Sequence, residues 1–414
     1  MLDSIIAFFS DPNVLKYASM PFISGIVGWG TNWVAVKMTF LPLEPIGKPP
    51  FFGWQGIVPA KCEKMAKISV DVITSKLLSV REIFSKIDSA KVAEILEDPL
   101  INLTVPIIDE AMLESSPVMW ETLPVMIKSQ IYGRSAKDIP RVVKIITDDI
   151  INNVDDVFDL ESMVVSALVR DKALLNSMFL EVGHKEFKFI EISGFYFGFL
   201  FGILQMLLWI VAEAWWQLPV GGLIVGYLTN WLALKMIFEP AKPKKIGPFT
   251  LQGLFHKRQK EVAEAYGKLV TENVLNSKNI IDAILRGPLS DQVFRLIKKH
   301  TQNAVDSQAG MTKPLVLFTI GTKQYIELKN RVCDKLYNLL PNSLKYVQGY
   351  AMEAMDIANT LTTKLGALPS DEFEGMLRPA FQEDEWILIA VGALLGLVVG
   401  IFQLVVLFGG SIGG

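Results

Sequence analysis

The chain has 414 residues, a formal net charge of −3, and a composition that is 51% hydrophobic and 20% charged. This near-neutral balance gives no sign of nucleic-acid binding. The hydrophobic content is high for a soluble protein, yet the charged fraction requires a large surface in water. Together they are typical of a membrane protein with substantial aqueous domains, and the length allows two or three of ordinary size.

The first predicted element is an apolar segment from about Val14 to Leu41. No positively charged start or small-residue cleavage site of a secretory signal precedes it, so we expect it to be retained. It is long enough to span a bilayer, which takes about 20 mostly apolar residues. Its polar start at Asp11, Asn13 and Lys16, and its Gly-Trp-Gly break, leave open a re-entrant helix instead of a full span.

Three further apolar segments are long enough to span, and a hairpin of only six residues joins the first two of them: 189–211, 218–238 and 386–408. Four spans would place both long polar regions on one side of the membrane. The predicted fold is an all-α integral membrane protein. Its predicted parts are a first transmembrane helix (1–42), helical region 1 (43–188), a transmembrane hairpin (189–239), helical region 2 (240–385), and a last transmembrane helix with its tail (386–414).

Basic residues near the spans predict the orientation. Many lie on the side of the polar regions, whereas Lys16 is the one found on the other side. Because basic residues accumulate in cytoplasmic loops, we expect a multi-pass protein of the bacterial cytoplasmic (inner) membrane with both polar regions in the cytoplasm.

Both polar regions are predicted to be helical. Ala263, Tyr266, Val270 and Val274 follow a spacing of three and four, which makes one apolar helix face. No alternating strand pattern stands out. Prolines are expected to divide the first region into short helices; they are Pro106, Pro117, Pro124 and Pro140.

Two apolar motifs recur at one spacing. Thr31-Asn32-Trp33 returns 198 positions later as Thr229-Asn230-Trp231 (32 to 230). A second motif recurs at the same offset; it comprises Gly194, Gly198, Gly202 and Gln205, then Gly392, Gly396, Gly400 and Gln403. The shared offset predicts a tandem internal repeat of a membrane-embedded unit.

The glycines of the second motif lie four apart, so they share one helix face and allow a neighbouring helix to approach closely. That neighbour is either another helix of the same molecule or a helix of a second copy. Gln205 and Gln403 flank the same face. Each either bonds a neighbouring helix or lines a polar pathway, because an amide in hydrocarbon needs a partner.

The Thr-Asn pairs also allow two interpretations. They either hold helices together or form a solute or ion site at a broken helix. No acidic residue accompanies them at membrane depth, which disfavours a coupled transporter. Lys37 follows Trp33 by four positions and Lys235 follows Trp231 likewise, so each lysine is expected to lie along its indole and anchor the helix at the cytoplasmic surface.

A matched stretch rich in proline, glycine and aromatic residues follows each Thr-Asn-Trp helix, at 42–56 and 240–253. We expect an irregular elbow at the membrane interface. Basic residues come next. They either bind lipid headgroups or reflect only the general excess of basic residues on the cytoplasmic side. These candidates are Lys61, Lys64, Lys257, Arg258 and Lys260.

Motifs for catalysis are lacking. His184, His256 and His300 have no metal-ligand spacing, and no nucleophile, phosphate-binding or dinucleotide motif is present. The sequence therefore predicts no catalytic residue, no metal, no cofactor and no enzyme activity. Cys62 and Cys333 are expected to be free thiols.

The stretch Thr-Asn-Trp-x-Ala-x-Lys-Met-x-Phe-x-Pro, present at 31–42 and 229–240, resembles a bacterial membrane-protein family known as domain of unknown function 445. The Gln-Gly elbow, the lead from Phe381 to Trp386 and the glycine-rich helix resemble it too. Copy one departs from the pattern at 183–187. The resemblance implies a multi-pass membrane protein and supplies no reaction and no catalytic residue.

Three functions remain open at this point. The first is a non-enzymatic protein that self-associates as a homo-oligomer and organises or shapes the membrane. The second is a carrier that binds a lipid or another hydrophobic molecule. The third is a channel or transporter built around Asn32 and Asn230. Membrane lipids are the expected partners in the first two.

Overall fold

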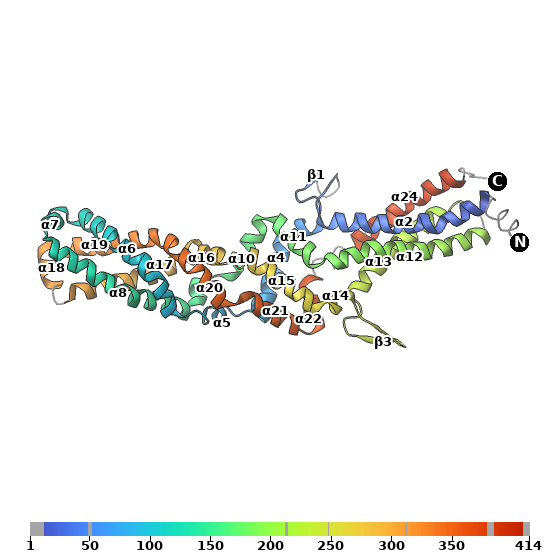
Figure 1. The fold of residues 1–414 in the computed structure, drawn as a ribbon. Coiled ribbons are helices and arrows are strands. Elements are labelled where there is room, and N and C mark those ends of the chain that lie inside the picture. The colour runs from blue at the N-terminus through green and yellow to red at the C-terminus, as the bar shows by residue number, and fades with distance from the viewer. Residues whose placement is uncertain are drawn as a thin grey trace. The chain divides into compact units, whose positions relative to one another are not determined.

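A computed structural model describes residues 12–48, 52–211, 214–246, 248–310, 313–378 and 385–408. The chain ends, the tips of both elbows, part of the predicted hairpin turn and most of the lead into the last span lie outside the described residues. The described chain is nearly all helical, as predicted (Figure 1). It divides into two compact units; unit 1 comprises Met1–Ser69, Leu168–Tyr266 and Thr362–Gly414, and unit 2 comprises Val70–Ala167 and Gly267–Leu361.

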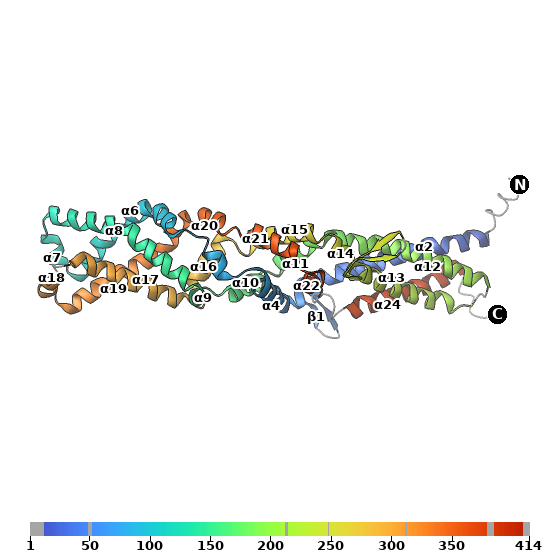
Figure 2. The same cartoon turned by 90° about the horizontal axis from the view of Figure 1, so that it is seen from below.

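Unit 1 contains four long helices that lie side by side (Figures 1 and 2). They are α2 (Pro12–Phe40), α12 (His184–Val211), α13 (Gln217–Phe238) and α24 (Glu385–Phe408). Helix α2 packs most extensively on α12, and α13 packs most extensively on α24. Each pair therefore combines one Thr-Asn-Trp helix with one glycine-rich helix.

Three of these helices are long and apolar enough to cross a membrane: His184–Val211, Gln217–Phe238 and Glu385–Val406. They match the second, third and fourth predicted spans. Helix α2 occupies the place of the first predicted span but is not among the three. Its sequence is interrupted by Lys16, Pro21 and the Thr31-Asn32 pair, which lower its hydropathy.

The elbows are more regular than predicted. Strands β1 (Ile46–Lys48) and β2 (Phe52–Trp54) form an antiparallel pair, and so do β3 (Lys244–Ile246) and β4 (Phe249–Leu251). The expectation of irregular elbows without strands was wrong. Hydrogen bonds close both loops at their base, from Gly56 N to Pro42 O at 3.0 Å and from Gly253 N to Pro240 O at 3.0 Å. Each strand has only three residues, which is too short for an alternating pattern to be visible in the sequence. The hairpins therefore could not be predicted from local sequence.

Shorter helices complete unit 1 and reach its boundaries. They are α3 (Ile57–Ala60), α4 (Cys62–Val72), α10 (Leu160–Arg170), α11 (Lys172–Val182), α14 (Leu254–Lys257), α15 (Gln259–Asn273), α21 (Ile357–Ala367) and α22 (Ser370–Leu377). The boundaries between the units fall within α4, α10, α15 and α21. The predicted apolar face of α15 is buried, since Ala263 and Val270 are at most 2% exposed, and Val274 just past the end of the helix is 1% exposed.

Unit 2 is built on four long helices, α6 (Ser89–Ser115), α8 (Val125–Asn152), α17 (Ser290–Ala309) and α19 (Thr322–Ser343). Helix α6 packs on α8 and α19, and α17 packs on the same two helices, so the four surround one interior. The remaining elements are short. They are η1 (Ile73–Leu77), α5 (Val80–Phe84), α7 (Pro117–Thr122), α9 (Val154–Val157), α16 (Ser277–Arg286), α18 (Lys313–Ile320), η3 (Leu344–Tyr346) and α20 (Gln348–Met355).

Prolines divide the first polar region only in part. Pro117 opens α7 and Pro124 precedes α8, as predicted. Pro106 lies inside α6 and Pro140 lies inside α8, so the prediction was wrong at these two positions. A proline removes one backbone hydrogen bond and bends the helix. Packing of the apolar face against neighbouring helices can stabilise a long helix in spite of that loss.

Candidate functional site

The interior of unit 2 contains a cavity of about 330 Å³ between α6, α8, α17 and α19. Val92 and Met112 both line it and lie 20 residues apart on α6 (92 to 112). At a rise of 1.5 Å per residue, the lining of this one helix extends for about 30 Å. The cavity is therefore long and narrow, and its volume falls within the range of small-molecule sites.

The cavity is lined by apolar helix faces that do not pack against one another. Ile139, Val143, Ile146 and Ile150 repeat at a spacing of three and four along α8 and all line the cavity. Yet no described residue of α8 is fully buried. On α19 the facing residues Leu336 and Leu340 are likewise only half-buried. The bundle thus presents two apolar faces to a space that their side chains do not fill.

The apolar lining makes this space a poor environment for water. Burying apolar surface stabilises a complex by roughly 25 cal/mol per Å². Filling the space with apolar matter is therefore favourable.

The few polar side chains of the cavity are mostly bonded within the protein. Thr104 donates to Leu100 O at 3.0 Å. Asp138 accepts two hydrogen bonds from Arg141, at 2.8 and 3.0 Å, and one from Gln308 Nε2 at 2.8 Å. The hydrogen bond from Arg141 is the main cause that lowers the pKa of Asp138. Among the described lining residues there is no lysine, arginine or histidine, so the cavity offers no positive charge to an anion.

An ion pair joins two helices beside the cavity. His300 on α17 and Asp149 on α8 approach to 2.6 Å, and Lys299 lies 3.7 Å from the same carboxylate. The hydrogen bond to His300 lowers the pKa of Asp149. The neighbouring residues Ile150 and Thr301 line the cavity, so these contacts link α8 and α17 directly beside it.

The glycine faces in unit 1 are packed within the chain. A Cβ built on Gly198 would lie under 3.0 Å from Ser24 O, and one on Gly396 would lie equally close to Gly222 O. Gly194 and Gly392 meet Gly28 and Gly226 in the same way. Gly202 faces Pro21, and Gly400 faces Leu218 and Pro219. Both faces are thus in contact with the Thr-Asn-Trp helix of their own pair.

The Thr-Asn pairs are buried and bonded to neighbouring backbone. Asn32 Nδ2 donates to Ile190 O at 2.6 Å, and Asn230 Nδ2 donates to Leu388 O at 2.7 Å. Thr31 Oγ1 donates to Gly28 O at 3.1 Å, and Thr229 Oγ1 to Gly226 O at 3.3 Å. Every one of these contacts recurs 198 positions along the chain. Each asparagine therefore links the two helices of its pair through Nδ2, whereas its Oδ1 is buried without a partner in the described part of the chain.

The two glutamines differ in their surroundings. Gln205 Oε1 accepts a hydrogen bond from Ser24 Oγ at 3.3 Å, and its amide lies against Gly221. Gln403 lines a groove of about 610 Å³ between α2 and α24. The Nε2 atoms of both glutamines are buried without a partner in the described part of the chain.

The two tryptophan–lysine pairs also differ. Lys235 Nζ lies 4.9 Å from the centre of the Trp231 ring, as the spacing predicts, and 3.5 Å from Glu239. Trp33 instead stacks on Trp29, with ring centres 6.5 Å apart. Lys37 is exposed at the end of α2.

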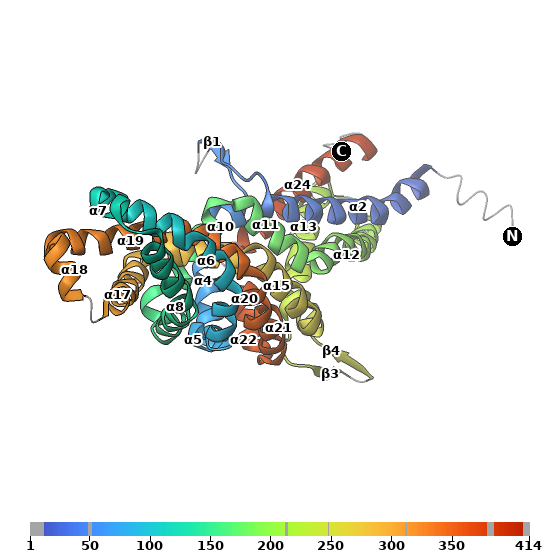
Figure 3. The same cartoon turned by 60° about the vertical axis from the view of Figure 1, so that its left-hand side comes forward.

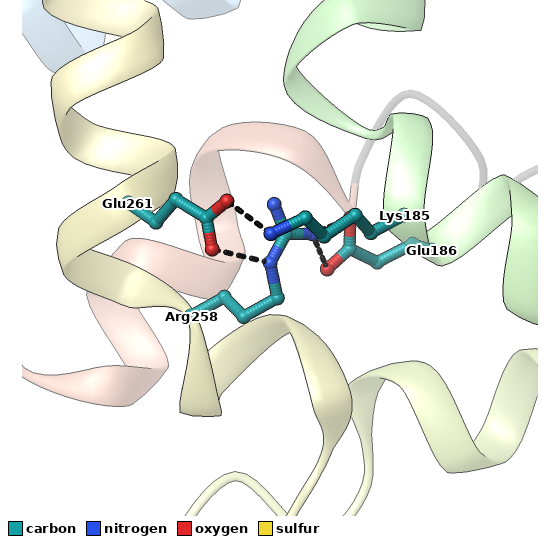
Figure 4. Close-up of polar contacts among 4 residues, drawn as sticks. All are labelled: Lys185, Glu186, Arg258 and Glu261. Atoms are coloured by element: carbon teal, nitrogen blue, oxygen red, sulfur yellow. Dashed lines mark hydrogen bonds and ion pairs between the residues drawn. The ribbon is translucent and has the colours of Figure 1, made fainter.

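Arg258 was predicted as a headgroup ligand, but it is bonded within the protein. Its Nη1 lies 2.6 Å from both carboxylate oxygens of Glu186, and its Nε lies 2.9 Å from Glu261 (Figure 4). Lys185 pairs with Glu261 beside it. These hydrogen bonds lower the pKa of Glu261 to about 2, with that from Arg258 the largest cause. Lys257 and Lys260 are exposed, Lys64 is exposed, and Lys61 is half-buried, so these four are better placed than Arg258 to meet lipid.

Replacing Arg258 with alanine is expected to destabilise the protein by about 3–5 kcal/mol, because it leaves the buried Glu186 carboxylate without its partner. Replacing Lys185 with alanine removes an exposed pair and should cost less than about 1 kcal/mol. Thermal unfolding in one mild detergent would compare the two variants. Equal losses would contradict a special role for the Arg258–Glu186 pair.

One further buried polar group was not predicted from the sequence. His256 Nε2 lies 3.1 Å from Phe238 O and 3.3 Å from Glu374, and the ring is fully enclosed. Its Nδ1 is buried without a partner in the described chain. Within the described residues, no group of three or more His, Cys, Asp and Glu side chains could hold a metal ion. The cavity residues were also missed as a site, although their spacing of three and four on α8 and α19 was visible in the sequence.

Comparison with known proteins finds sequence similarity to one family over part of the chain. Residues 220–345 match the model described as "Protein of unknown function (DUF445)". The resemblance predicted from the sequence is confirmed. The match to DUF445 includes α13, with its Thr-Asn-Trp motif, and α16, α17 and α19, which line the cavity.

Bacterial proteins show the same DUF445 relationship. The chain is 30% identical over 164 residues to a UPF0754 membrane protein of Staphylococcus saprophyticus, covering 37% of this chain and 42% of that protein. It is 31% identical over 97 residues to one from Halalkalibacterium halodurans, covering 23% and 26%. It is 33% identical over 144 residues to one from Staphylococcus aureus, covering 30% and 38%.

These matches span less than half the length of each relative. No solved structure matches the chain. The relatives are named as membrane proteins, which agrees with the three apolar helices of unit 1.

Proposed function

We propose that this protein is held in a bacterial membrane by unit 1 and binds an apolar molecule, with an acyl or isoprenoid chain, in the cavity of unit 2. The single observation that carries the proposal is the long apolar cavity between α6, α8, α17 and α19. Its lining matches a hydrocarbon chain in character, and its narrow shape fits an extended chain better than a compact ring system. The protein then acts as a carrier or sensor and not as an enzyme.

The proposal includes a tandem duplication with four membrane helices in two equivalent pairs. The recurrence of the asparagine and glycine contacts at an offset of 198 supports it. Both polar regions then lie on one side, which the positive-inside rule assigns to the cytoplasm of the inner membrane.

The leading hypothesis from the sequence, a self-associating, membrane-shaping protein, loses one of its supports. It was motivated by the glycine faces, and these pack against α2 and α13 inside one chain. The transporter alternative is weakened in the same way, because both asparagines donate to backbone carbonyl groups of neighbouring helices.

Gentle purification followed by native mass spectrometry tests the proposal. The expected result is about one lipid per chain that persists when the annular detergent and lipid are stripped. Extraction and lipid analysis would then identify its chain and headgroup. Protein that carries no stoichiometric lipid, and does not take up an added fluorescent acyl probe, would overturn the proposal.

A further inference from the structure

One end of unit 2 carries large apolar side chains that are almost fully exposed. They are Val118 (75% exposed), Val125 (80%), Met126 (69%) and Phe318 (90%), and together we call them the apolar tip. They belong to α7, the start of α8, and α18, which lie at the same end of the unit in every view (Figures 1, 2 and 3). The other exposed large hydrophobic residues described in unit 2 are at most 64% exposed.

The tip is held firmly by the residues beneath it. Trp120 on α7 is buried, and its Nε1 donates to Asp109 on α6 at 3.1 Å. Tyr132 on α8 donates to the same carboxylate, and burial and this bond raise its pKa to about 12. Lys128 lies over the Trp120 ring at 5.1 Å. These contacts fix the turn between α7 and α8, so its apolar residues project outward in a defined conformation.

The cavity approaches the same end of the unit. Its lining includes Met112 in the last turn of α6, Gln308 in the last turn of α17, and Ile131 and Leu328 in the second turns of α8 and α19. These four residues lie within about two turns of α7 and α18. The apolar tip therefore lies at an end of unit 2 from which the route into the cavity is short.

An apolar ligand reaches such a route most easily from lipid. Each methylene group that enters water adds to the cost of transfer, so a long hydrocarbon chain crosses an aqueous gap only at a large cost in free energy. Exposed apolar side chains at the end of the cavity remove that gap if they enter a bilayer. We infer that the apolar tip docks on a bilayer surface and is the entry for the cavity ligand. The entry role rests on the proposed function, whereas the docking does not.

Environment-sensitive fluorescence tests the docking. The variant Met126→Cys can be labelled selectively with the fluorophore NBD, because Cys62 and Cys333 are buried. The full chain in lipid nanodiscs would be mixed with vesicles of phosphatidylethanolamine and phosphatidylglycerol. We expect a blue shift of the emission and its quenching by a quencher placed in the vesicle lipid. The same label on Glu94→Cys, at the opposite end of α6, should show neither.

Two further variants complete the test. Changing Val125 and Phe318 to serine should weaken vesicle binding at least tenfold, since each loses the transfer energy of a large apolar side chain. Val105→Ser, at a less exposed apolar position on α6, serves as the control and should bind normally. No emission change in the labelled Met126→Cys variant, or an equal change when the two serine substitutions are added to it, would overturn the inference.

The alternative occupant is a second copy of the chain. It would give an emission shift that depends on protein concentration in the absence of vesicles, and that result would also overturn bilayer docking. Docking with no lipid in the cavity would contradict the proposed function and leave the docking in place. Stoichiometric lipid without docking would contradict the docking and leave the proposed function in place.

Discussion

Replacing Gly198 or Gly396 with isoleucine is expected to prevent the folding of unit 1. A Cβ at either position would lie under 3.0 Å from a backbone carbonyl oxygen of the facing helix, Ser24 O or Gly222 O. Backbone cannot rotate away as a flexible side chain can, so the paired helices must separate. Overpacking in a tight interior typically costs 1–3 kcal/mol, and a branched side chain against backbone belongs at or above about 3 kcal/mol. Separation would also break the nearby bonds of Asn32 and Asn230.

The measurement is the yield and the thermal unfolding midpoint of each variant in one mild detergent. Gly30→Ala is the matched control, since Gly30 lies on α2 and has nothing within 4 Å of a built Cβ. It should fold normally. If the isoleucine variants folded as well as Gly30→Ala and changed only the oligomer size, the glycine faces would be contacts between molecules, and the packing described above would be wrong.

Replacing Ala304 with phenylalanine is expected to empty the cavity of ligand without unfolding the protein. Ala304 lines the cavity from α17, and a phenyl ring there would occupy the space that the ligand chain needs. Filling an apolar cavity usually stabilises a protein by about 0.5–2 kcal/mol. Bound lipid should therefore fall at least tenfold while the unfolding midpoint stays constant or rises once lipid has been removed from both proteins.

Native mass spectrometry and thermal unfolding would be measured on the same preparations. Asn303→Phe is the matched control, because position 303 is on the same helix but exposed. It adds the same ring outside the cavity and should keep its lipid. Unchanged lipid content in Ala304→Phe would show that the lipid binds elsewhere, and the groove between α2 and α24 would be the next place to look.

Much of the architecture could be predicted from local patterns. The apolar runs at 189–211, 218–238 and 386–408 predicted α12, α13 and α24 to within a few residues, except that α12 begins earlier, at His184. The early start reflects Glu186, whose charge is neutralised by Arg258 rather than by water. That pairing joins residues 72 positions apart, so no local pattern could reveal it.

The candidate site could not be predicted from local sequence patterns either. The spacing of Ile139, Val143 and Ile146 predicts an apolar face on α8, but a face that meets a tightly packed neighbour and a face that borders a cavity have the same spacing. Which of the two occurs depends on the distance between α8 and α19. Such distances depend on contacts between segments far apart in the chain, such as the hydrogen bond between Asp149 and His300 that links α8 to α17.

The sequence by itself determined the helices, the apolar spans, the recurring motifs and the family resemblance, because periodicity and composition are properties of short segments. Only the tertiary structure decided that the glycine faces are filled within one chain, that Arg258 is paired, and that unit 2 encloses an apolar cavity with an exposed apolar tip at one end. The physical reason is that close approach and separation of helices depend on the summed volumes of side chains from segments far apart in the chain. Glycine lets the long helices of unit 1 approach backbone to backbone, whereas larger apolar side chains lie between the helices of unit 2.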